Sequence, residues 1–207
     1  MFTFFGIPVS VSPWSALLTL LLGWSAYVYV KKMHPYSNKA GYLATAAVLT
    51  VVAVLSLAVH EISHGLMAYA FRIPIVQAGF TGWGAFVQPA DSFSEMPFWQ
   101  EVLIVAAGPA SNFVLGGLAA IVVKWLPESL FENSVQYVGY LNLQLGRINL
   151  YPIFVLDGAK IVHGLLRGIM GNQAADVGLV AVSFFFIIYL VLRKRRRPSL
   201  EDRLETL

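Results

Sequence analysis

The sequence predicts an all-α polytopic membrane protein with about five to six transmembrane helices and a small β-sheet at the membrane surface. Hydrophobic residues make up 57% of its 207 residues, charged residues make up only 12%, and the mean hydropathy is +0.69. Apolar stretches recur along the chain, and a helix needs about 20 such residues to cross about 30 Å of hydrocarbon. We therefore expect residues 1–207 to form a single membrane-embedded domain.

The apolar stretches place the transmembrane segments in order along the chain. Five spans are expected, at residues 13–30, 41–70, 98–125, 134–165 and 174–192. A re-entrant segment at 158–171 would change this number. The core of the domain is expected to cover residues 41–167, and a basic tail follows at 193–207.

Two shorter segments predict the sheet. Residues 1–12 lack the basic start of a signal peptide and are expected to be retained as a short strand that leads into the first span. Residues 72–97 are too polar and glycine-rich to cross the membrane, and their aromatic and β-branched residues alternate with glycines in a hairpin pattern. The edge of such a hairpin could hold an extended peptide by strand addition. The alternative is an ordinary surface hairpin.

Three ionisable side chains, His60, Glu61 and His64, interrupt the second apolar stretch, where lipid makes them costly. Residues four apart project from one face of a helix, so the two imidazoles can bind one metal ion. A carboxylate beside them could take a proton from a water that the metal activates and pass it to a leaving amine. The H-E-x-x-H pattern is typical of zinc hydrolases. The alternative, a buried histidine pair with a carboxylate partner, is disfavoured within a membrane span.

Asp157 is the candidate third ligand. The chain has no cysteine, so a zinc ion must be held by nitrogen and oxygen atoms. Asp157 lies near a span that Pro152 interrupts and Gly158 loosens. Its oxygen would complete a set of two histidines and one carboxylate with a fourth position open, as in catalytic zinc sites. Equally, Asp157 could cap a helix that begins near Gly158, and the residues alone leave both interpretations open.

Three motifs in this order resemble the site-2 protease family of intramembrane zinc metalloproteases. They are His60-Glu61-x-x-His64, Gly108-Pro109-x-x-Asn112 and Asn149-x-x-Pro152-x-x-x-Leu156-Asp157-Gly158, so the match covers about residues 60–160. The resemblance implies one zinc ion per chain, bound by His60, His64 and Asp157. It further implies that Glu61 is the catalytic acid/base and that Asn149 holds the scissile carbonyl or its oxyanion. Residues 5–9 and 79–89 are similar to the small sheet of that family.

Some residues near the motifs depart from the usual family pattern. Ser63 stands where the family often has glycine, and Val155 stands where proline often precedes the Leu-Asp-Gly sequence. Arg147 needs a partner at its depth, which could be Glu101, a carbonyl at a helix end, or water. None of these departures removes a metal ligand or the base.

Two further polar residues need an interpretation. Asn112 either orients a metal ligand as its hydrogen-bond partner or bonds simply between helices. His163 follows Asp157 by six residues, but a lone histidine in an amphipathic stretch is more often interfacial, so we leave it outside the ligand set.

The resemblance implies an intramembrane endopeptidase that cleaves transmembrane segments of membrane-tethered proteins, as in regulated intramembrane proteolysis. Its partners would be a transmembrane protein substrate and the lipid bilayer, and its expected location is the plasma membrane. The first alternative is a metal transporter that uses the same cluster as transit ligands, but residues 41–59 offer only threonines, a tyrosine and a serine as polar groups. The second alternative is a catalytically silent relative, which would usually have lost Glu61 or a ligand.

Charge placement gives conflicting orientations. The positive-inside rule puts the basic tail, with the run at 193–197, in the cytoplasm. The family resemblance places the N-terminal strand and the hairpin there instead, which with five spans sends the tail outward. In either orientation, a short basic run that adjoins a span is expected to contact anionic lipid rather than nucleic acid.

Overall fold

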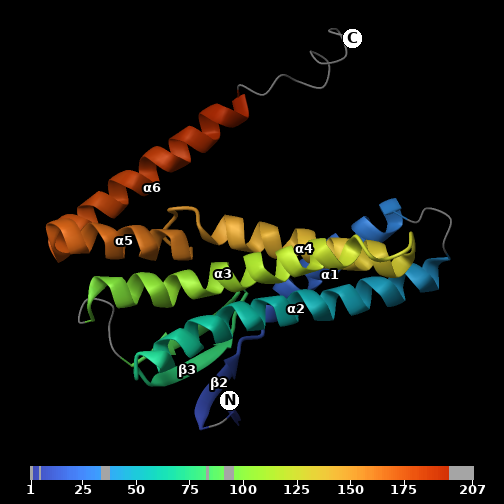
Figure 1. The fold of residues 1–207 in the computed structure, drawn as a ribbon, viewed down its shortest axis with the longest axis horizontal. Helices are drawn as coiled ribbons and strands as arrows, with labels where there is room; N and C mark the ends of the chain where they lie inside the picture. Colours follow the sequence, from blue (N-terminus) through green and yellow to red (C-terminus); the bar gives the residue numbers. More distant parts are fainter. Residues whose placement is uncertain (1, 5, 34–37, 83, 91–95, 196–207) are drawn as a thin grey trace.

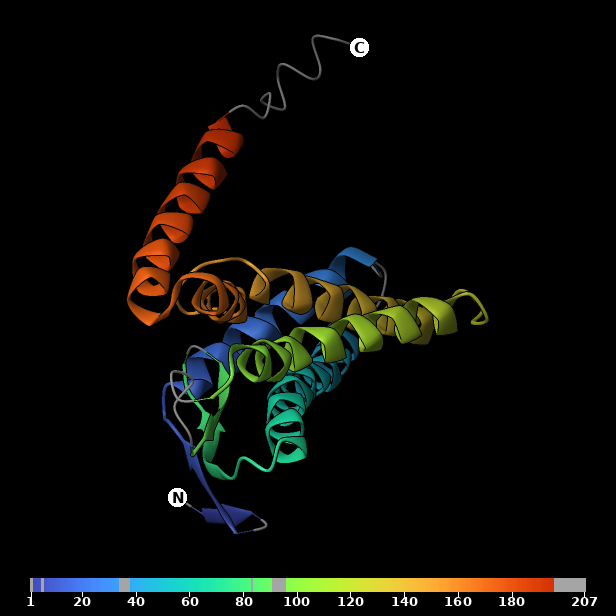
Figure 2. The ribbon, with the colours of Figure 1, turned by 60° about the vertical axis from the view of Figure 1, so that its left-hand side comes forward.

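The computed structural model describes residues 2–4, 6–33, 38–82, 84–90 and 96–195, so most of the predicted basic tail, residues 196–207, lies outside the described residues. Within the described ranges the strands and helices are β1 (Phe2–Phe4), β2 (Ile7–Val11), α1 (Ser15–Met33), α2 (Lys39–Ala70), β3 (Ile75–Phe80), β4 (Ala85–Pro89), α3 (Phe98–Val123), α4 (Leu130–Asn149), α5 (Asp157–Met170) and α6 (Asn172–Arg195). Figures 1 and 2 show α6 leaving the helix bundle at a steep angle.

The described residues contain three helices that are long and apolar enough to cross a membrane, namely α2, α3 and α6. They correspond to the predicted spans at 41–70, 98–125 and 174–192. Helix α1 covers most of the first predicted span, but neither α1 nor α4 is among these three. The predicted mainly helical membrane architecture is therefore confirmed, whereas the total of five to six spans is not.

The fourth predicted span, residues 134–165, is wrong as a single helix. Helix α4 ends at Asn149, α5 begins at Asp157, and residues 150–156 connect them. Pro152 has no backbone N–H and pushes the preceding residue toward extended conformations, so a helix does not continue through it. This break places Asp157 at the start of a new helix.

The predicted small sheet is present and has four strands in the order β1-β2-β3-β4. Residues 1–12 contribute two strands rather than the one expected, and the predicted hairpin is the antiparallel pair β3 and β4. Strands β2 and β3 pair in parallel, with Val9 opposite Ala78. Strand β4 forms an edge of the sheet and packs against α2, which brings the sheet beside the half of α2 that carries the H-E-x-x-H residues (Figure 1).

Helix α3 is the centre of the bundle, because it packs against α2, α4 and α5. Small residues allow the helix axes to approach closely. A Cβ atom added to Gly139 of α4 would lie 3.0 Å from the Cβ of Ala119, and one added to Gly146 would lie 3.1 Å from the carbonyl oxygen of Pro109. The close approach of α4 to α3 brings polar side chains of α4 within reach of Asn112.

Candidate metal centre

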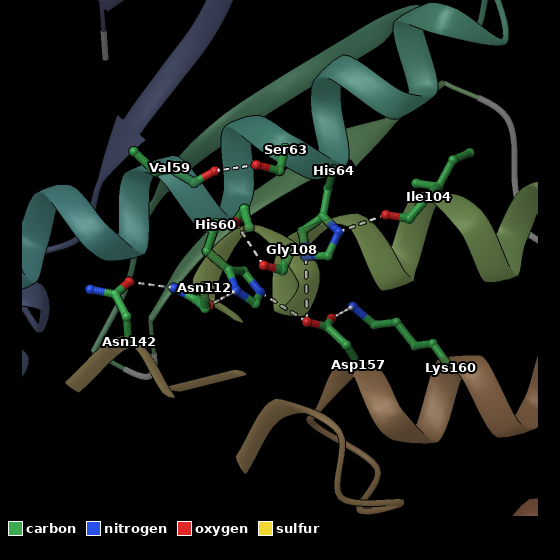
Figure 3. A network of polar contacts seen from close by, with 11 residues as sticks. Val59, His60, Ser63, His64, Ile104, Gly108, Asn112, Asn142, Asp157 and Lys160 are labelled. Atoms are coloured by element: carbon green, nitrogen blue, oxygen red, sulfur yellow. Dashed lines mark hydrogen bonds and ion pairs between the residues drawn. The ribbon is translucent and has the colours of Figure 1, made fainter. Parts of the chain in front are cut away.

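The structure brings His60, His64 and Asp157 together from two helices. Nε2 of His60 lies 2.9 Å from Oδ2 of Asp157, and Nε2 of His64 lies 3.4 Å from the same oxygen. One ligand atom from each residue lies within 4.8 Å of the other two, and Figure 3 shows the three side chains converging. His60 and Asp157 are only 3% and 6% exposed, so their polar atoms must be satisfied by one another or by a bound group.

The orientation of His64 is fixed by the main chain of α3. Its Nδ1 lies 2.8 Å from the carbonyl oxygen of Ile104, which can only accept a hydrogen bond. Nδ1 therefore carries a hydrogen and donates it, which leaves the lone pair of Nε2 free for an ion bound between this ring and Asp157. A histidine that binds metal through one ring nitrogen is typically held through the other in this way.

Gly108 leaves open the space next to the histidine rings. A Cβ atom on Gly108 would lie 2.6 Å from Nε2 of His60 and still closer to the ring of His64, so no other residue type fits there without displacing them. Two imidazole nitrogens and one carboxylate oxygen around such a space match the donor set of catalytic zinc. The residues present therefore fit one zinc ion.

The two oxygens of Asp157 have separate partners. Oδ2 faces the two histidines, while Oδ1 lies 3.5 Å from Nζ of Lys160, one turn later on α5. The N-cap of α5 is Leu156, and no side chain caps this helix end. Asp157 is thus the first helical residue with its side chain directed at the histidines, which argues against its interpretation as a helix cap.

A cavity of about 520 Å³ opens onto this cluster. Glu61 and Asn149, the two residues expected to act on the substrate, both line it, together with the three candidate ligands. Leu18 and Leu22 of α1 and residues 84–87, next to and within β4, also line the cavity. The cavity thus brings a carboxylate, an amide and a candidate zinc site to one largely apolar space.

Asn112 lies at the back of the cluster, away from the cavity. Its Oδ1 is 2.5 Å from Nδ1 of His60, and its Nδ2 donates to Oδ1 of Asn142 at 2.9 Å. The side chain is fully buried. Both interpretations drawn from the sequence therefore apply to Asn112. Its Oδ1 contacts a candidate metal ligand, and its Nδ2 forms a hydrogen bond to another helix.

Arg147 and His163 lie elsewhere. Arg147 is exposed and donates to the side chain of Gln144 at 2.6 Å rather than to Glu101. Glu101 is 1% exposed and pairs with Arg167 at 2.9 Å and with His163 at 3.2 Å. This ion-pair cluster joins α3 to α5 and lies outside the three-residue metal centre.

Sequence reasoning missed three contributors to the centre: Gly108 as the space beside the rings, Lys160 as the partner of Asp157, and Asn142 as the partner of Asn112. The sequence held a signal for Asn142, because an asparagine among apolar residues of a helix is costly unless it has a partner. Asn142 also lies seven residues, about two turns, before Asn149. Its partner on another helix could not be read from that spacing.

A fold of membrane-spanning helices around a histidine and carboxylate cluster defines an integral membrane protein with the architecture of a zinc metalloprotease. The model of Peptidase family M50 matches residues 47–129 and 125–192, and the chain belongs to this family, the site-2 protease family.

Individual relatives agree with this assignment. The "Putative zinc metalloprotease sll0528" of Synechocystis sp. is 29% identical over 175 residues, which cover 82% of this chain and 44% of that protein. "Zinc metalloprotease MJ0392" of Methanocaldococcus jannaschii is 28% identical over 138 residues, covering 64% of this chain and 40% of that protein. The chain thus spans less than half the length of these two curated relatives.

A solved structure shows the same fold. The "Site-2 Protease from Methanocaldococcus jannaschii" superimposes with a TM-score of 0.57 and 22% sequence identity, covering 91% of this chain and 88% of that one. The site-2 protease fold therefore extends over nearly the whole chain.

Proposed function

We propose that this protein is an intramembrane zinc metalloendopeptidase that cleaves peptide bonds within or near the transmembrane segments of membrane-tethered proteins. The observation that carries the proposal is the convergence of His60, His64 and Asp157 on one point of a cavity that Glu61 also lines. Two of these ligands lie on α2, which is long and apolar enough to span the membrane. In this proposal residues 1–207 act as one domain, and the protein resides in the plasma membrane.

Five residues that line the cavity have roles in the proposed peptide hydrolysis. His60, His64 and Asp157 hold the zinc ion, which when bound supplies a Lewis acid that polarises the scissile carbonyl and activates water near neutral pH. Glu61 accepts the proton of the attacking water and delivers it to the departing amide nitrogen. The amide N–H of Asn149 donates to the carbonyl oxygen as negative charge develops on it.

The apolar walls of the cavity would limit the access of bulk water to the reacting groups. Leu18, Leu22 and Leu57 line it, and a transmembrane substrate would cover the remaining opening. When bulk water is excluded the local dielectric falls. The hydrogen bond from Asn149 to the developing oxyanion and the electrostatic interactions of Glu61 then become stronger.

The edge of the sheet supplies a means to present the substrate. A transmembrane helix hides its peptide carbonyls in its own hydrogen bonds, so a segment of it must unwind before hydrolysis. Strand β4 is at an edge of the sheet, and residues 84–87 line the cavity. An unwound substrate segment that pairs with this edge would lie extended beside the metal centre.

The experiment that tests this function uses purified protein in lipid nanodiscs with a panel of tagged single-pass proteins whose transmembrane sequences differ. Mass spectrometry then locates each cut. We expect cuts within or near the transmembrane segment, and Glu61→Gln should slow them about 10²- to 10⁴-fold while zinc is retained, because only the acid/base is lost.

Cuts confined to soluble segments, or equal cleavage by the parent and Glu61→Gln, would contradict the proposal. The same protein reconstituted into sealed vesicles tests the alternative. Zinc uptake into these vesicles, without cleavage of any panel member, would favour a metal transporter instead.

A further inference from the structure

A continuous line of buried side chains runs from His60 to the main chain of two helices. Asn112 of α3 contacts Nδ1 of His60 at 2.5 Å and donates its Nδ2–H to Oδ1 of Asn142 on α4 at 2.9 Å. Asn142 in turn donates to Oγ of Ser56 at 3.0 Å and to the carbonyl oxygen of Val138 at 2.9 Å. Asn112 and Asn142 are fully buried and Ser56 is 4% exposed, so water does not compete with these bonds.

The bonds have a direction that is set at their far end. The carbonyl of Val138 can only accept, so the NH₂ group of Asn142 must face it. The hydroxyl of Ser56 donates to the carbonyl oxygen of Val52 at 3.0 Å, and its oxygen therefore accepts from the same NH₂ group. Two independent backbone carbonyls thus fix which way the amide of Asn142 points.

This direction passes from one amide to the next. With its NH₂ group toward Val138, Asn142 presents Oδ1 to Asn112. Asn112 must therefore donate to this oxygen with its own NH₂ group. The Oδ1 of Asn112 then faces Nδ1 of His60 and accepts a hydrogen bond from it. The ring of His60 must therefore carry a hydrogen on Nδ1, which leaves the lone pair of Nε2, the nitrogen 2.9 Å from Asp157, free for an ion bound between the two side chains.

We propose that Asn142 is a positioning residue of the metal centre, which acts through Asn112 to hold His60 in the tautomer that binds zinc through Nε2. The inference builds on the metal centre of the proposed function. His64 reaches the same state directly through the carbonyl of Ile104, whereas the ring of His60 is oriented through two successive amides.

The placement of Asn142 has a second consequence. Asn149 follows it by seven residues, about two turns of α4, so the two asparagines share one face of that helix. The bonds of Asn142 to Ser56 on α2 and, through Asn112, to His60 therefore tie the helix that carries Asn149 to the helix that carries the histidines. One hydrogen-bonded line sets the tautomer of a ligand and the position of a residue proposed to bind substrate.

The test measures the zinc affinity of the full-length protein in detergent by competition with a chromophoric chelator. Asn142→Leu removes the amide but keeps the branched outline of the side chain, and it frees Asn112 to turn its NH₂ group toward His60. We expect zinc affinity to fall about 10- to 100-fold, the usual effect of losing a partner behind a metal ligand.

Ser56→Ala is the matched control, because it removes a bond of the same buried line but leaves Val138 to orient Asn142. Its zinc affinity should fall by less than about tenfold. Unchanged affinity in Asn142→Leu, or equal losses in both variants, would overturn the proposal. Absence of zinc from the parent protein would instead contradict the proposed function itself.

A second measurement requires no variant. In zinc-loaded parent protein labelled with ¹⁵N at histidine, long-range proton correlations identify which nitrogen of each ring carries the hydrogen. The proposal expects a hydrogen on Nδ1 of His60. A hydrogen on Nε2 of that ring would overturn it, whatever the stability of Asn142→Leu.

Discussion

Gly108 on α3 faces the ring of His64 on α2 with no side chain between them, and a Cβ atom at this position would overlap the ring. The same atom would lie 2.6 Å from Nε2 of His60. The glycine of the G-P-x-x-N motif therefore does more than allow helices to pack. It keeps open the space in which the two histidines can share one ion.

Gly108→Ala should abolish zinc binding, because its methyl group would compete with the ion and push the rings apart. Gly117→Ala is the matched control on the same helix, since a Cβ atom there has no neighbour within 4 Å. Zinc content of the two purified variants, measured by elemental analysis, decides the question. Full zinc occupancy in Gly108→Ala would show that the space beside this glycine is not where the ion binds.

Asn149→Ala should separate metal binding from catalysis. Asn149 lines the cavity but is not among the three clustered ligands, so zinc content should be unchanged. Loss of one oxyanion donor usually lowers kcat by about 10²- to 10³-fold. Cleavage of a substrate found with the panel above provides the measurement, and an unaltered kcat would remove Asn149 from the proposed mechanism.

Arg167 should stabilise the fold through the buried carboxylate of Glu101. Their side chains are 9% and 1% exposed, and removing one partner of a buried pair typically costs about 3–5 kcal/mol. Arg167→Met should lose stability on this scale, measured by reversible unfolding in mixed micelles. Arg147→Met makes the same chemical change at an exposed arginine and should stay within about 0.5 kcal/mol. Equal effects of the two substitutions would argue against the ion pair.

Proline substitutions in β4 should test substrate capture by the sheet edge. Adjacent residues of an edge strand direct their N–H groups to opposite sides, so one of Phe86→Pro and Val87→Pro removes an N–H that faces outward. That variant should keep the sheet and its zinc content but cleave transmembrane substrates more slowly. Unchanged cleavage by both variants would count against strand addition.

Much of this architecture can be predicted from the sequence, because it depends on the hydropathy and turn residues of each segment by itself. The apolar stretches of α2, α3 and α6 predict their own positions, and the glycine-punctuated segment at 72–97 predicts the hairpin. Averaged hydropathy fails between α4 and α5, because the residues on both sides of Pro152 are apolar while the proline itself decides where the helix stops.

The candidate metal centre also has one part that the sequence predicts and one part that it does not. The four-residue spacing of His60 and His64 is a property of one helix, so it could be inferred from the chain alone. The orientation of their rings depends on Ile104, Asn112 and Asn142, which belong to two other helices. Contacts between helices are set by packing that no periodicity records, and they appear only when the helices are placed in space.

The most direct test of the account is the zinc content of the full-length protein purified in detergent, beside His64→Ala, Asp157→Ala and His163→Ala. The account predicts about one zinc ion per chain in the parent, a marked loss in the first two variants, and full retention in His163→Ala, whose ring instead contacts Glu101 and Asp176. Absence of zinc from the parent, or equal zinc in all four proteins, would contradict the three-ligand centre and the protease mechanism built on it.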